Sequence, residues 1–573
     1  MDKKVYEFIA AQTGEKIEEW RTCPNCGQEF AITDKDLEFY KKISPVFNGT
    51  KYEIPAPTLC PDCRQQRRFL HENERKLYKR KCDLTGKTII STYSPDSEYK
   101  VYGQNERRSD KRNPMDYWIN FDFTKTFFEQ FDELLKNVPA LSLIVLNSEN
   151  ADYNNLCVSL KNTYLTFNTL ELQNSLYSNE ISFWNSISDC SYSRDLEECY
   201  ECISCHSSYK LFYSQNCYSC NDSYFMFDCI WCNNCIWCYN LNNKEYCIFN
   251  KQYTKEEYES QKKDLLSRQK FIIQKLKELK KDIIITDFNK NSENSFWYNL
   301  VNCHDIQNSF DNSDCEKSKN IFNSKNITNS YDYNWWAWPS ALSYEMILTL
   351  ECYNCLYSIL SSWRNLIYCS SCFGNSNLFG CVWLRNKEYC IFNKQYTKEE
   401  YEQLVPKIIE HMKNTWERWE FFPASITPFG YNETVANEYF PLSRDEALKQ
   451  WYKRQDKEYP INVPDWIELV RAQDLPDNIH DLDDEILKKA IVCEVSGKLF
   501  RIVKPELDFY CKHNLPLPHK HPDVRHLERL SKRAPRQLYL RTCDNCGKQV
   551  ISVYPQNSEF KVYCEECYNK EIY

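Results

Sequence analysis

Glycine is scarce in this chain. It accounts for only 10 of the 573 residues, well below the usual ~7%. Tryptophan, with 15 residues, is by contrast abundant. One hypothesis explains both numbers: some codons written as tryptophan are reassigned stop codons that the host reads as glycine. Trp383, in the string Leu-Phe-Gly-Cys-Val-Trp-Leu, is a candidate.

Long apolar segments and export signals are also missing. The apolar run from Leu141 to Leu146 is among the longest, and a membrane helix needs about 20 such residues. The charged start, Met-Asp-Lys-Lys-Val, lacks the apolar region of a signal peptide. We therefore expect no membrane association and a cytoplasmic location, where thiols stay reduced. The 31 cysteines are accordingly interpreted as metal ligands and small buried side chains rather than disulfides.

Familiar catalytic motifs are absent. The sequence contains no nucleophile elbow, no His-Glu-x-x-His and no dinucleotide fingerprint. Nine histidines are few for acid–base chemistry, and four of them crowd into residues 513–526. We leave catalysis unassigned and favour a protein that is not an enzyme. The net charge of −9 argues against coating of a whole nucleic acid, although local basic patches can still act.

The two ends of the chain are copies of one cysteine-containing module. From Pro55 and Pro516 onward the copies run in step at a constant offset. Each copy has kept a different one of two cysteine tetrads. The complete tetrads are Cys23, Cys26, Cys60 and Cys63 in the first copy, and Cys543, Cys546, Cys564 and Cys567 in the second. Two Cys-x-x-Cys knuckles fit tetrahedral Zn²⁺ and leave no open position for a substrate water. We predict about two structural zinc ions per chain.

The partner sites of the two modules are eroded. Beside Cys82 the expected ligand positions hold Thr85, Gly103 and Glu106, so we expect that site to be empty. Beside Cys493 the corresponding residues are Ser496, His521 and Val524, with other thiols and imidazoles close in sequence. A weaker candidate metal set is therefore Cys493, Cys511, His519 and His521.

A basic segment lies between the two sites of each module. Its arginines and lysines are candidates for contacts to nucleic-acid phosphates. The alternative is a solvated helix face, or arginines that pair with the acidic remainder of the protein. The candidate residues are Arg64, Arg67, Arg68, Arg75, Lys79 and Arg80 in the first copy, and Arg525, Arg529, Lys532, Arg533 and Arg536 in the second.

The middle of the chain is repetitive. The string from Asn243 to Glu259 recurs unchanged as Asn386 to Glu402. Cys-x-x-Cys pairs also recur with a period of 18, as at Cys199, Cys217 and Cys235. Such short repeats, rich in Tyr, Ile, Ser and Asn, are typical of the stacked coils of a β-solenoid.

Helices are expected beside the repeats. The strings beginning at Thr254 and Thr397 are capping boxes, which predict helices over 255–281 and 398–420. A shorter helix is expected to open at Ser443, and 123–136 reads as an amphipathic helix.

The fold class predicted from these signals is multidomain and mainly β. Two short-coil β-solenoid units with intervening helices are flanked by duplicated zinc-ribbon or treble-clef modules. The expected divisions are an N-terminal module at 1–110, a helical connector at 111–150, a first solenoid at 151–253, a helix at 254–285, a second solenoid at 286–396, a helical connector at 397–490 and a C-terminal module at 491–573.

The central cysteines allow two interpretations. Cys199, Cys202 and Cys205 begin like a ferredoxin cluster motif, but the fourth position is Tyr209. Residues three apart in an extended coil are expected to point to opposite faces, which argues against convergence on one cluster. We favour buried, inert cysteine ladders, with metal or redox chemistry as the alternative.

Several strings resemble an uncharacterised family of large zinc-ribbon, cysteine-repeat proteins of small-genome uncultivated bacteria. They are Glu74–Lys87, Asn377–Val382, Asn386–Cys390 and Val492–Lys498. The resemblance covers nearly the whole chain and implies zinc-finger ends around a cysteine-repeat middle. It implies no activity.

Three functions remain open at this point. The first is a non-catalytic scaffold whose zinc ends present basic helices to RNA, DNA or a ribonucleoprotein. The second is a protein-interaction platform that uses the solenoid faces, with the basic segments buried internally. The third is a thiol-based metal or redox enzyme.

Overall fold

The computed structural model describes residues 1–108, 113–267, 282–286, 289–290, 292–335, 339–459 and 463–572. It is a mainly β protein built on a β-solenoid that spans 145–391, with a four-cysteine cluster at each end of the chain. None of the helices in the described part of the chain combines the length and apolarity that crossing a bilayer requires.

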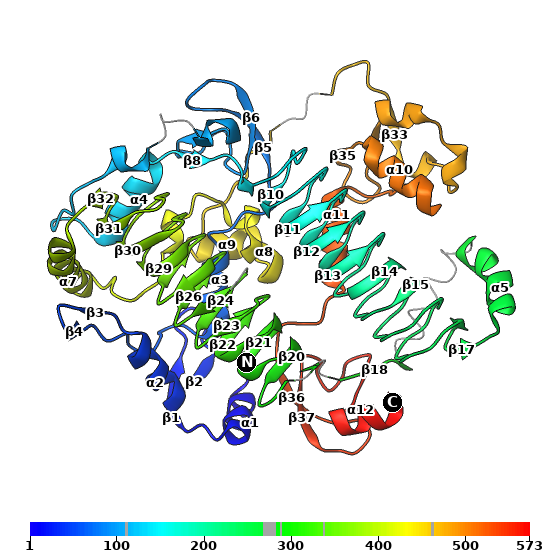
Figure 1. The fold of residues 1–573 in the computed structure, drawn as a ribbon, viewed down its shortest axis with the longest axis horizontal. Helices are drawn as coiled ribbons and strands as arrows, with labels where there is room; N and C mark the ends of the chain where they lie inside the picture. The colour runs from blue at the N-terminus through cyan, green and yellow to red at the C-terminus, as the bar shows by residue number, and fades with distance from the viewer. Residues whose placement is uncertain are drawn as a thin grey trace.

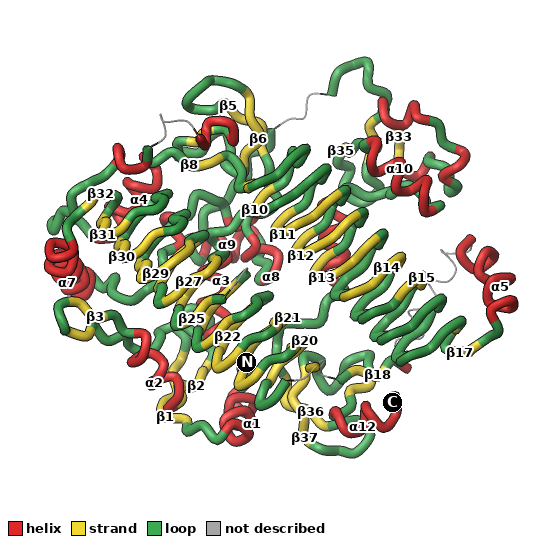
Figure 2. Tube along the Cα trace, in the orientation of Figure 1, coloured by secondary structure: helices red, strands yellow, loops and turns green. Residues whose placement is uncertain are grey.

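The solenoid strands form two sheets (Figures 1 and 2), and they pair in parallel except for the last strand, which is antiparallel to its neighbour. The seven strands of the first sheet are β9 (Val145–Leu146), β10 (Asn155–Val158), β11 (Phe167–Gln173), β12 (Asn179–Asn185), β13 (Ser191–Glu197), β14 (His206–Phe212) and β15 (Asn221–Tyr224). The second sheet comprises β19 (Asn289–Lys290), β20 (Phe296–Val301), β21 (His304–Ser313), β22 (Glu316–Phe322), β23 (Ile327–Thr328), β24 (Tyr331–Asn334), β25 (Ser340–Ala341), β26 (Tyr344–Ile347), β27 (Leu350–Tyr353), β28 (Leu356–Ile359), β29 (Ser362–Ile367), β30 (Asn375–Phe379), β31 (Glu388–Ile391) and β32 (Lys394–Gln395).

Neighbouring coils of the solenoid repeat with a period of 12, so the predicted period of 18 is wrong as a coil length. Phe167 pairs with Asn179, and Asn179 pairs with Ser191. Within a coil, every third residue has a positive φ, as at Asn168 and Glu171. Because this residue turns the chain after each short extended piece, a coil consists of four sides, each a triplet of residues. The period of 18 is six such triplets, or one and a half coils.

The triplet geometry also decides which side chains enter the lumen. Cys229, Cys232, Cys235 and Cys238 are all fully or almost fully buried. The expectation that residues three apart point to opposite faces is therefore wrong, because the left-handed residue in each triplet resets the direction of the chain. Four inward side chains per coil leave a narrow lumen, which the cysteines fill together with Leu, Ile and Met.

The second sheet is less regular than the first, in agreement with the cysteine spacing. Leu356 pairs with Ile367, which is one position short of the regular coil, and Tyr331 pairs with Tyr344, which is one position beyond it. The early recurrence of the cysteine pair that begins at Cys369 reflects the shortened coil.

Shorter elements surround the solenoid. On the N-terminal side they are α1 (Lys3–Thr13), β1 (Ile17–Thr22), β2 (Glu29–Thr33), α2 (Asp34–Ile43), β3 (Val46–Phe47), β4 (Thr50–Lys51), α3 (Pro61–Phe69), β5 (Tyr78–Lys81), β6 (Thr88–Ser91), β7 (Val101–Tyr102), α4 (Phe127–Asn137) and β8 (Ala140–Leu141). In the middle they are β16 (Cys247–Ile248), β17 (Lys251–Gln252), α5 (Lys255–Ser267) and β18 (Ile284–Ile285). On the C-terminal side they are α7 (Lys398–Asn414), α8 (Val435–Tyr439), α9 (Arg444–Lys449), β33 (Leu469–Arg471), β34 (Ala490–Val492), β35 (Leu499–Phe500), α10 (Lys504–His513), α11 (Pro522–Ser531), β36 (Tyr539–Thr542), β37 (Gln549–Ser552), β38 (Lys561–Val562) and α12 (Glu565–Ile572).

The predicted capping boxes are confirmed. Thr397 accepts a hydrogen bond from the backbone N–H of Glu400, whose carboxylate accepts one from the N–H of Thr397. The same reciprocal pair links Thr254 and Glu257, and Ser443 caps α9.

The helix ends were predicted less well. Helix α7 ends at Asn414 rather than 420, and α4 begins at 127 rather than 123. The expected stretch 268–281 of the first helix lies outside the described residues.

Candidate metal centres and arginine clamps

The N-terminal tetrad combines a hairpin with a helix start. Cys23 and Cys26 lie in the turn between β1 and β2, where Gly27 adopts a φ of 74° and its N–H donates to the carbonyl of Cys23 at 2.8 Å. Cys60 is the N-cap residue of α3, and Cys63 lies in its first turn. The four sulfurs lie within 4.8 Å of one another, so this site can hold a metal ion.

The C-terminal tetrad repeats this arrangement. Cys543 and Cys546 lie between β36 and β37, and Gly547 has the same φ of 74°. Cys564 precedes α12, which contains Cys567. These four sulfurs also lie within 4.8 Å of one another. The sequence thus located both candidate metal sites correctly.

Backbone hydrogen bonds favour the thiolate of one cysteine in each tetrad, whereas burial raises the pKa of Cys26 and Cys567. Burial opposes ionisation of Cys23, yet the N–H groups of Cys60 and Cys26 lower its pKa to about 7. At Cys543 burial has the same opposing effect, and the N–H groups of Cys546 and Cys564 lower the pKa to about 6. A thiol that ionises readily is the form that binds a metal.

The eroded sites do not form metal-ligand groups. The two cysteine tetrads are the groups of three or more candidate ligands that converge in the part of the chain the structure describes. Cys493 is buried but Cys511 is exposed on α10. His519 faces Glu494 at 3.4 Å, and His521 accepts the N–H of Asp523 as the N-cap of α11. These four residues therefore do not converge on one site in the described structure. Cys82 accepts a hydrogen bond from the N–H of Gly103, a residue that occupies an expected ligand position and has no side chain to bind a metal.

Helix α3 inserts arginines against the second sheet of the solenoid. The Arg64 guanidinium pairs with Asp332 of β24 at 2.9 Å, and Arg68 pairs with Glu345 of β26 at 2.8 Å. Arg67 also reaches Glu345, at 3.0 Å. Burial raises the pKa of Glu345, but the three arginines outweigh it and hold the pKa below its usual value. The carboxylate is therefore ionised and anchors the helix.

Helix α11 makes the corresponding contact with the first sheet. Arg525 and Arg529 both pair with Asp189, which precedes β13; the Arg529 contact is 2.7 Å. Arg529 also reaches Glu201 at 3.1 Å. The side chains of Arg525, Arg529 and Asp189 are almost completely buried.

The segment after α11 bridges the two sheets. Arg533 pairs with Asp311 of β21, and its guanidinium lies 3.4 Å from the ring centroid of Tyr192 of β13. Arg536 lies 3.2 Å from the centroid of Phe322 of β22. We call the ion-paired arginines of α3 the N-terminal clamp, and those of α11 with Arg533 and Arg536 the C-terminal clamp.

Most of the predicted nucleic-acid contacts are thus occupied inside the molecule. Arg80 pairs with Asp83 at 3.0 Å, and Arg75 lies over the Phe167 ring at 4.6 Å. Lys79 and Lys532 of the same prediction have exposed side chains. A buried guanidinium that already holds a carboxylate cannot also bind a phosphate without rearrangement.

The clamp carboxylates were missed by the sequence interpretation. Asp189, Asp332 and Glu345 all occupy the left-handed position of a triplet, with φ between 53° and 56°. They are completely or almost completely buried. Nothing in their local sequence separates them from the many acidic residues on the surface.

The central cysteines are buried, as expected. The thiol of Cys202 donates to the carbonyl of Leu211 at 3.1 Å, and that of Cys205 donates to Ile203 at 3.4 Å. The thiols thereby donate hydrogen bonds to backbone carbonyls of their own coil and of the next coil. One signal could have revealed the triplets: the spacings between the cysteines from Cys157 to Cys247 are all multiples of three.

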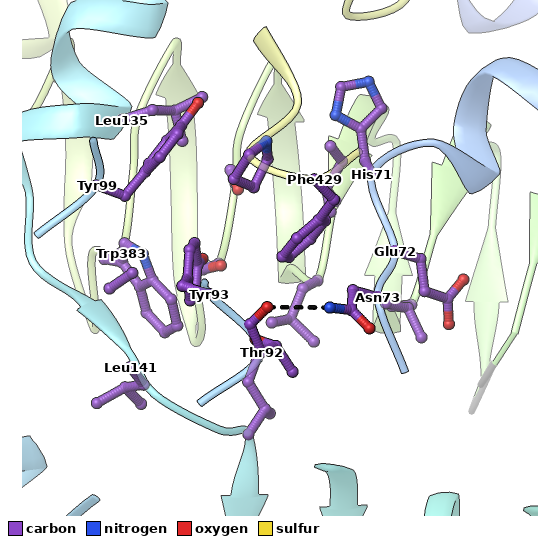
Figure 3. A pocket seen from close by; sticks show the side chains of 18 of the residues that line it. His71, Glu72, Asn73, Thr92, Tyr93, Tyr99, Leu135, Leu141, Trp383 and Phe429 are labelled. Carbon is purple, nitrogen blue, oxygen red and sulfur yellow. Dashed lines mark hydrogen bonds between the residues drawn. The ribbon is translucent and has the colours of Figure 1, made fainter. Parts of the chain in front are cut away.

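An interior cavity lies where the N-terminal module meets the solenoid. It measures about 100 Å³ and is lined by His71, Tyr93, Trp383 and Phe429, among others (Figure 3). Burial lowers the pKa of His71 to about 4, so its imidazole is neutral at physiological pH. The side chain of Asn73 donates to the carbonyl of Thr92 at 3.0 Å. The lining is largely aromatic and aliphatic and joins residues of the N-terminal module to residues of the solenoid.

Comparison with known proteins supplies no relative. The chain matches no protein-family model, and no curated protein matches it.

Proposed function

We propose that the chain is a non-catalytic binding scaffold whose terminal modules are zinc-stabilised and lock the solenoid from both sides. The observation that carries this proposal is the pair of arginine clamps. In the clamps, most arginines of the basic segments pair with carboxylates inside the molecule. The outward faces of the solenoid then remain to bind a partner, and we propose that this partner is another protein.

The proposal includes the finer architecture. Each Cys₄ cluster has the ligand chemistry of structural Zn²⁺, in a zinc-ribbon or treble-clef module, with about two ions per chain. The middle divides into two solenoid units, at 151–253 and 286–396. Two parallel sheets with α5 between them in the sequence support this division.

Lysine-directed crosslinking in the native host tests the scaffold. Exposed lysines on the solenoid, such as Lys161, Lys317 and Lys325, should form most of the links to partner peptides. Links concentrated on Lys79 and Lys532 would contradict the proposal. Elemental analysis of the purified protein should find about two zinc ions per chain, and an iron chromophore would instead support the redox alternative.

A second candidate function is nucleic-acid binding through a smaller basic surface than the sequence predicts. Exposed lysines on the β5–β6 hairpin, Lys79, Lys81 and Lys87, keep a small basic surface outside the N-terminal clamp. Fluorescence anisotropy with RNA and with DNA, over a salt series, measures this binding.

Charge reversal of these three lysines should abolish binding if this surface is responsible. Reversal of Lys398, Lys407 and Lys413 on α7 is the matched control. Binding that is lost equally in both variants reflects net charge rather than the hairpin.

A further inference from the structure

A polar cleft lies between the two sheets of the solenoid. Strands β11, β12, β13 and β14 contribute one wall, and β20, β21 and the residues that follow β22 contribute the other. The two rows of strands that form these walls are visible in Figure 2. The cleft has a volume of about 370 Å³, which lies in the range of ligand sites in proteins.

A cation without a counter-ion faces this cleft. The Arg194 guanidinium donates one hydrogen bond, to the Ser313 hydroxyl at 2.6 Å, and forms no ion pair in the described structure. Two of the nearby carboxylates have other partners: Asp311 pairs with Arg533, and Asp314 accepts from Asn302 at 3.0 Å. A third, Asp195, lines the same cleft and raises the pKa of Arg194 against the effect of burial. Burial lowers the pKa of Arg194. A partly buried cation with no ion-pair partner is unfavourable, and groups of this kind are often found where a ligand binds.

Other polar groups of the lining also have unused bonding capacity. The Oδ1 atom of Asn168 is buried with no hydrogen-bond partner. Burial and the neighbouring Arg194 lower the pKa of His206 to about 4, so this ring presents one donor and one acceptor. Phe183 lines the same cleft and keeps 36% of its surface exposed.

We propose that this cleft binds an anionic sugar. Arg194 would hold its carboxylate or phosphate, Asn168 and His206 would bond its hydroxyl groups, and the Phe183 ring would contact an apolar ring face. This small-molecule site is additional to the scaffold function and does not depend on it.

Calorimetric titration of the full chain tests this site. The probes are D-glucuronate, glucose 6-phosphate and neutral glucose. We expect one of the two anions to bind at least about tenfold more tightly than glucose, because the charged hydrogen bonds to Arg194 are strong. The two anions distinguish a carboxylate from a phosphate. Equal affinity for glucose, or no binding of either anion, would overturn the proposal.

Variants localise the binding. Arg194→Gln should weaken it at least about tenfold, whereas Arg364→Gln, an exposed arginine on solenoid strand β29, should leave it unchanged. The NMR signals of the His206 ring in the unaltered protein should shift on addition of the anion. Undiminished affinity in Arg194→Gln, or binding that does not shift the NMR signals of His206, would refute this location.

A separate observation concerns two helix ends. Helix α7 ends in a Schellman motif: the N–H of Glu417 donates to the carbonyl of Met412 at 2.8 Å, and Trp416 between them has a φ of 63°. Helix α9 ends in the same way. The N–H of Tyr452 donates to Ala447 at 3.0 Å, and Trp451 has a φ of 60°.

These two positions are glycine positions occupied by tryptophan. The left-handed residue that follows a helix is usually glycine, because a Cβ is strained there. Trp416 and Trp451 are 92% and 91% exposed, so packing of the indoles does not compensate for the strain. Trp383, the candidate from the sequence, is less diagnostic. It also has a positive φ, but so does every third residue of its coil.

We infer that residues 416 and 451 are glycine in the protein that its host makes. The excess of tryptophan and the shortage of glycine in the sequence are then two consequences of one reassigned codon. The inference rests on backbone geometry that the composition alone does not contain.

Peptide mass spectrometry of the natively expressed protein decides this. We expect the peptides that contain 416 and 451 to carry the glycine mass; the tryptophan mass at both positions would overturn the inference. In recombinant protein, Trp416→Gly should raise the melting temperature by about 2 °C or more. Trp466→Gly is the matched control, because Trp466 is 74% exposed without a positive φ. An equal change in both variants would count against the inference.

Discussion

The two terminal modules differ in how their metal site is connected to their clamp. In the N-terminal module, Cys60 caps α3, the helix that carries Arg64 and Arg68. In the C-terminal module, the clamp helix α11 begins at the eroded site, after His521. Its intact tetrad lies farther along the chain, in the turn between β36 and β37 and at the start of α12.

The two ends share a clamp but differ in which cysteine tetrad is complete. Both copies place arginines against buried solenoid carboxylates, although each uses a different surviving tetrad. A metal ion at the N-terminal tetrad would support the clamp directly, because Cys60 begins the clamp helix. At the C-terminal end it would support a separate subdomain, which docks through pairing of β38 with β18.

The largest expected effect separates the two metal sites. Cys60→Ser should remove the N-terminal metal and release α3, with a loss of at least about 5 kcal/mol, since structural zinc supplies on the order of 10 kcal/mol. Cys564→Ser should affect only residues 539–572. Hydrogen exchange should show deprotection of α3, β24 and β26 in the first variant alone. Retained protection of α3 there would show that its clamp does not need the metal.

The next effect compares the clamps themselves. Arg68→Met leaves two almost fully buried carboxylates, Glu345 and Asp332, with one cation fewer and should cost about 3–5 kcal/mol. Arg529→Met should cost less, roughly 2 kcal/mol, because Arg525 still pairs with Asp189 and the other carboxylate, Glu201, is partly exposed. Denaturant unfolding measures both. Lys398→Met, on the exposed face of α7, is the control, and a larger loss for Arg529→Met would reverse the ranking.

Acid should weaken the N-terminal interface through His71. Its folded pKa of about 4 lies below the ordinary value of about 6.5, so the unfolded state binds the proton first. This contribution to stability is intact above pH 6.5 and is lost as the pH falls toward 4. Between pH 7 and pH 5 the loss is about 2 kcal/mol.

The comparison with His71→Phe isolates this contribution. Unfolding free energies at the two pH values should show a smaller acid loss in the variant. An unchanged acid loss would mean that His71 does not titrate between the folded and unfolded states. Burial also lowers the pKa of His526 on α11, although Glu438 at 3.1 Å opposes this shift.

The smallest expected effect concerns the knuckle glycines. Gly27 and Gly547 share a φ of 74°, and an added Cβ would meet no atom within 4 Å at either position. Gly27→Ala and Gly547→Ala should therefore each cost only the backbone strain, about 1 kcal/mol. Thermal unfolding of each variant measures this. Unequal costs would show that the two knuckles are not equivalent.

The sequence predicted local features well where the interacting residues are close together. The knuckles, their glycines and the capping boxes at Thr254 and Thr397 each depend on a few neighbouring residues, and each is confirmed. The coil length was wrong because 18 and 12 are both multiples of the triplet. Only the pairing of strands such as Phe167 with Asn179 selects between them.

The sequence by itself determined the ligands of the candidate metal sites, the repetitive solenoid middle and the burial of its cysteines. Tertiary structure alone decided the fate of the basic segments. A charge run reads the same whether its arginines face solvent or carboxylates in a distant part of the chain, as Arg68 faces Glu345. Burial of such a pair depends on how the helix docks on the solenoid, and no local pattern encodes that contact.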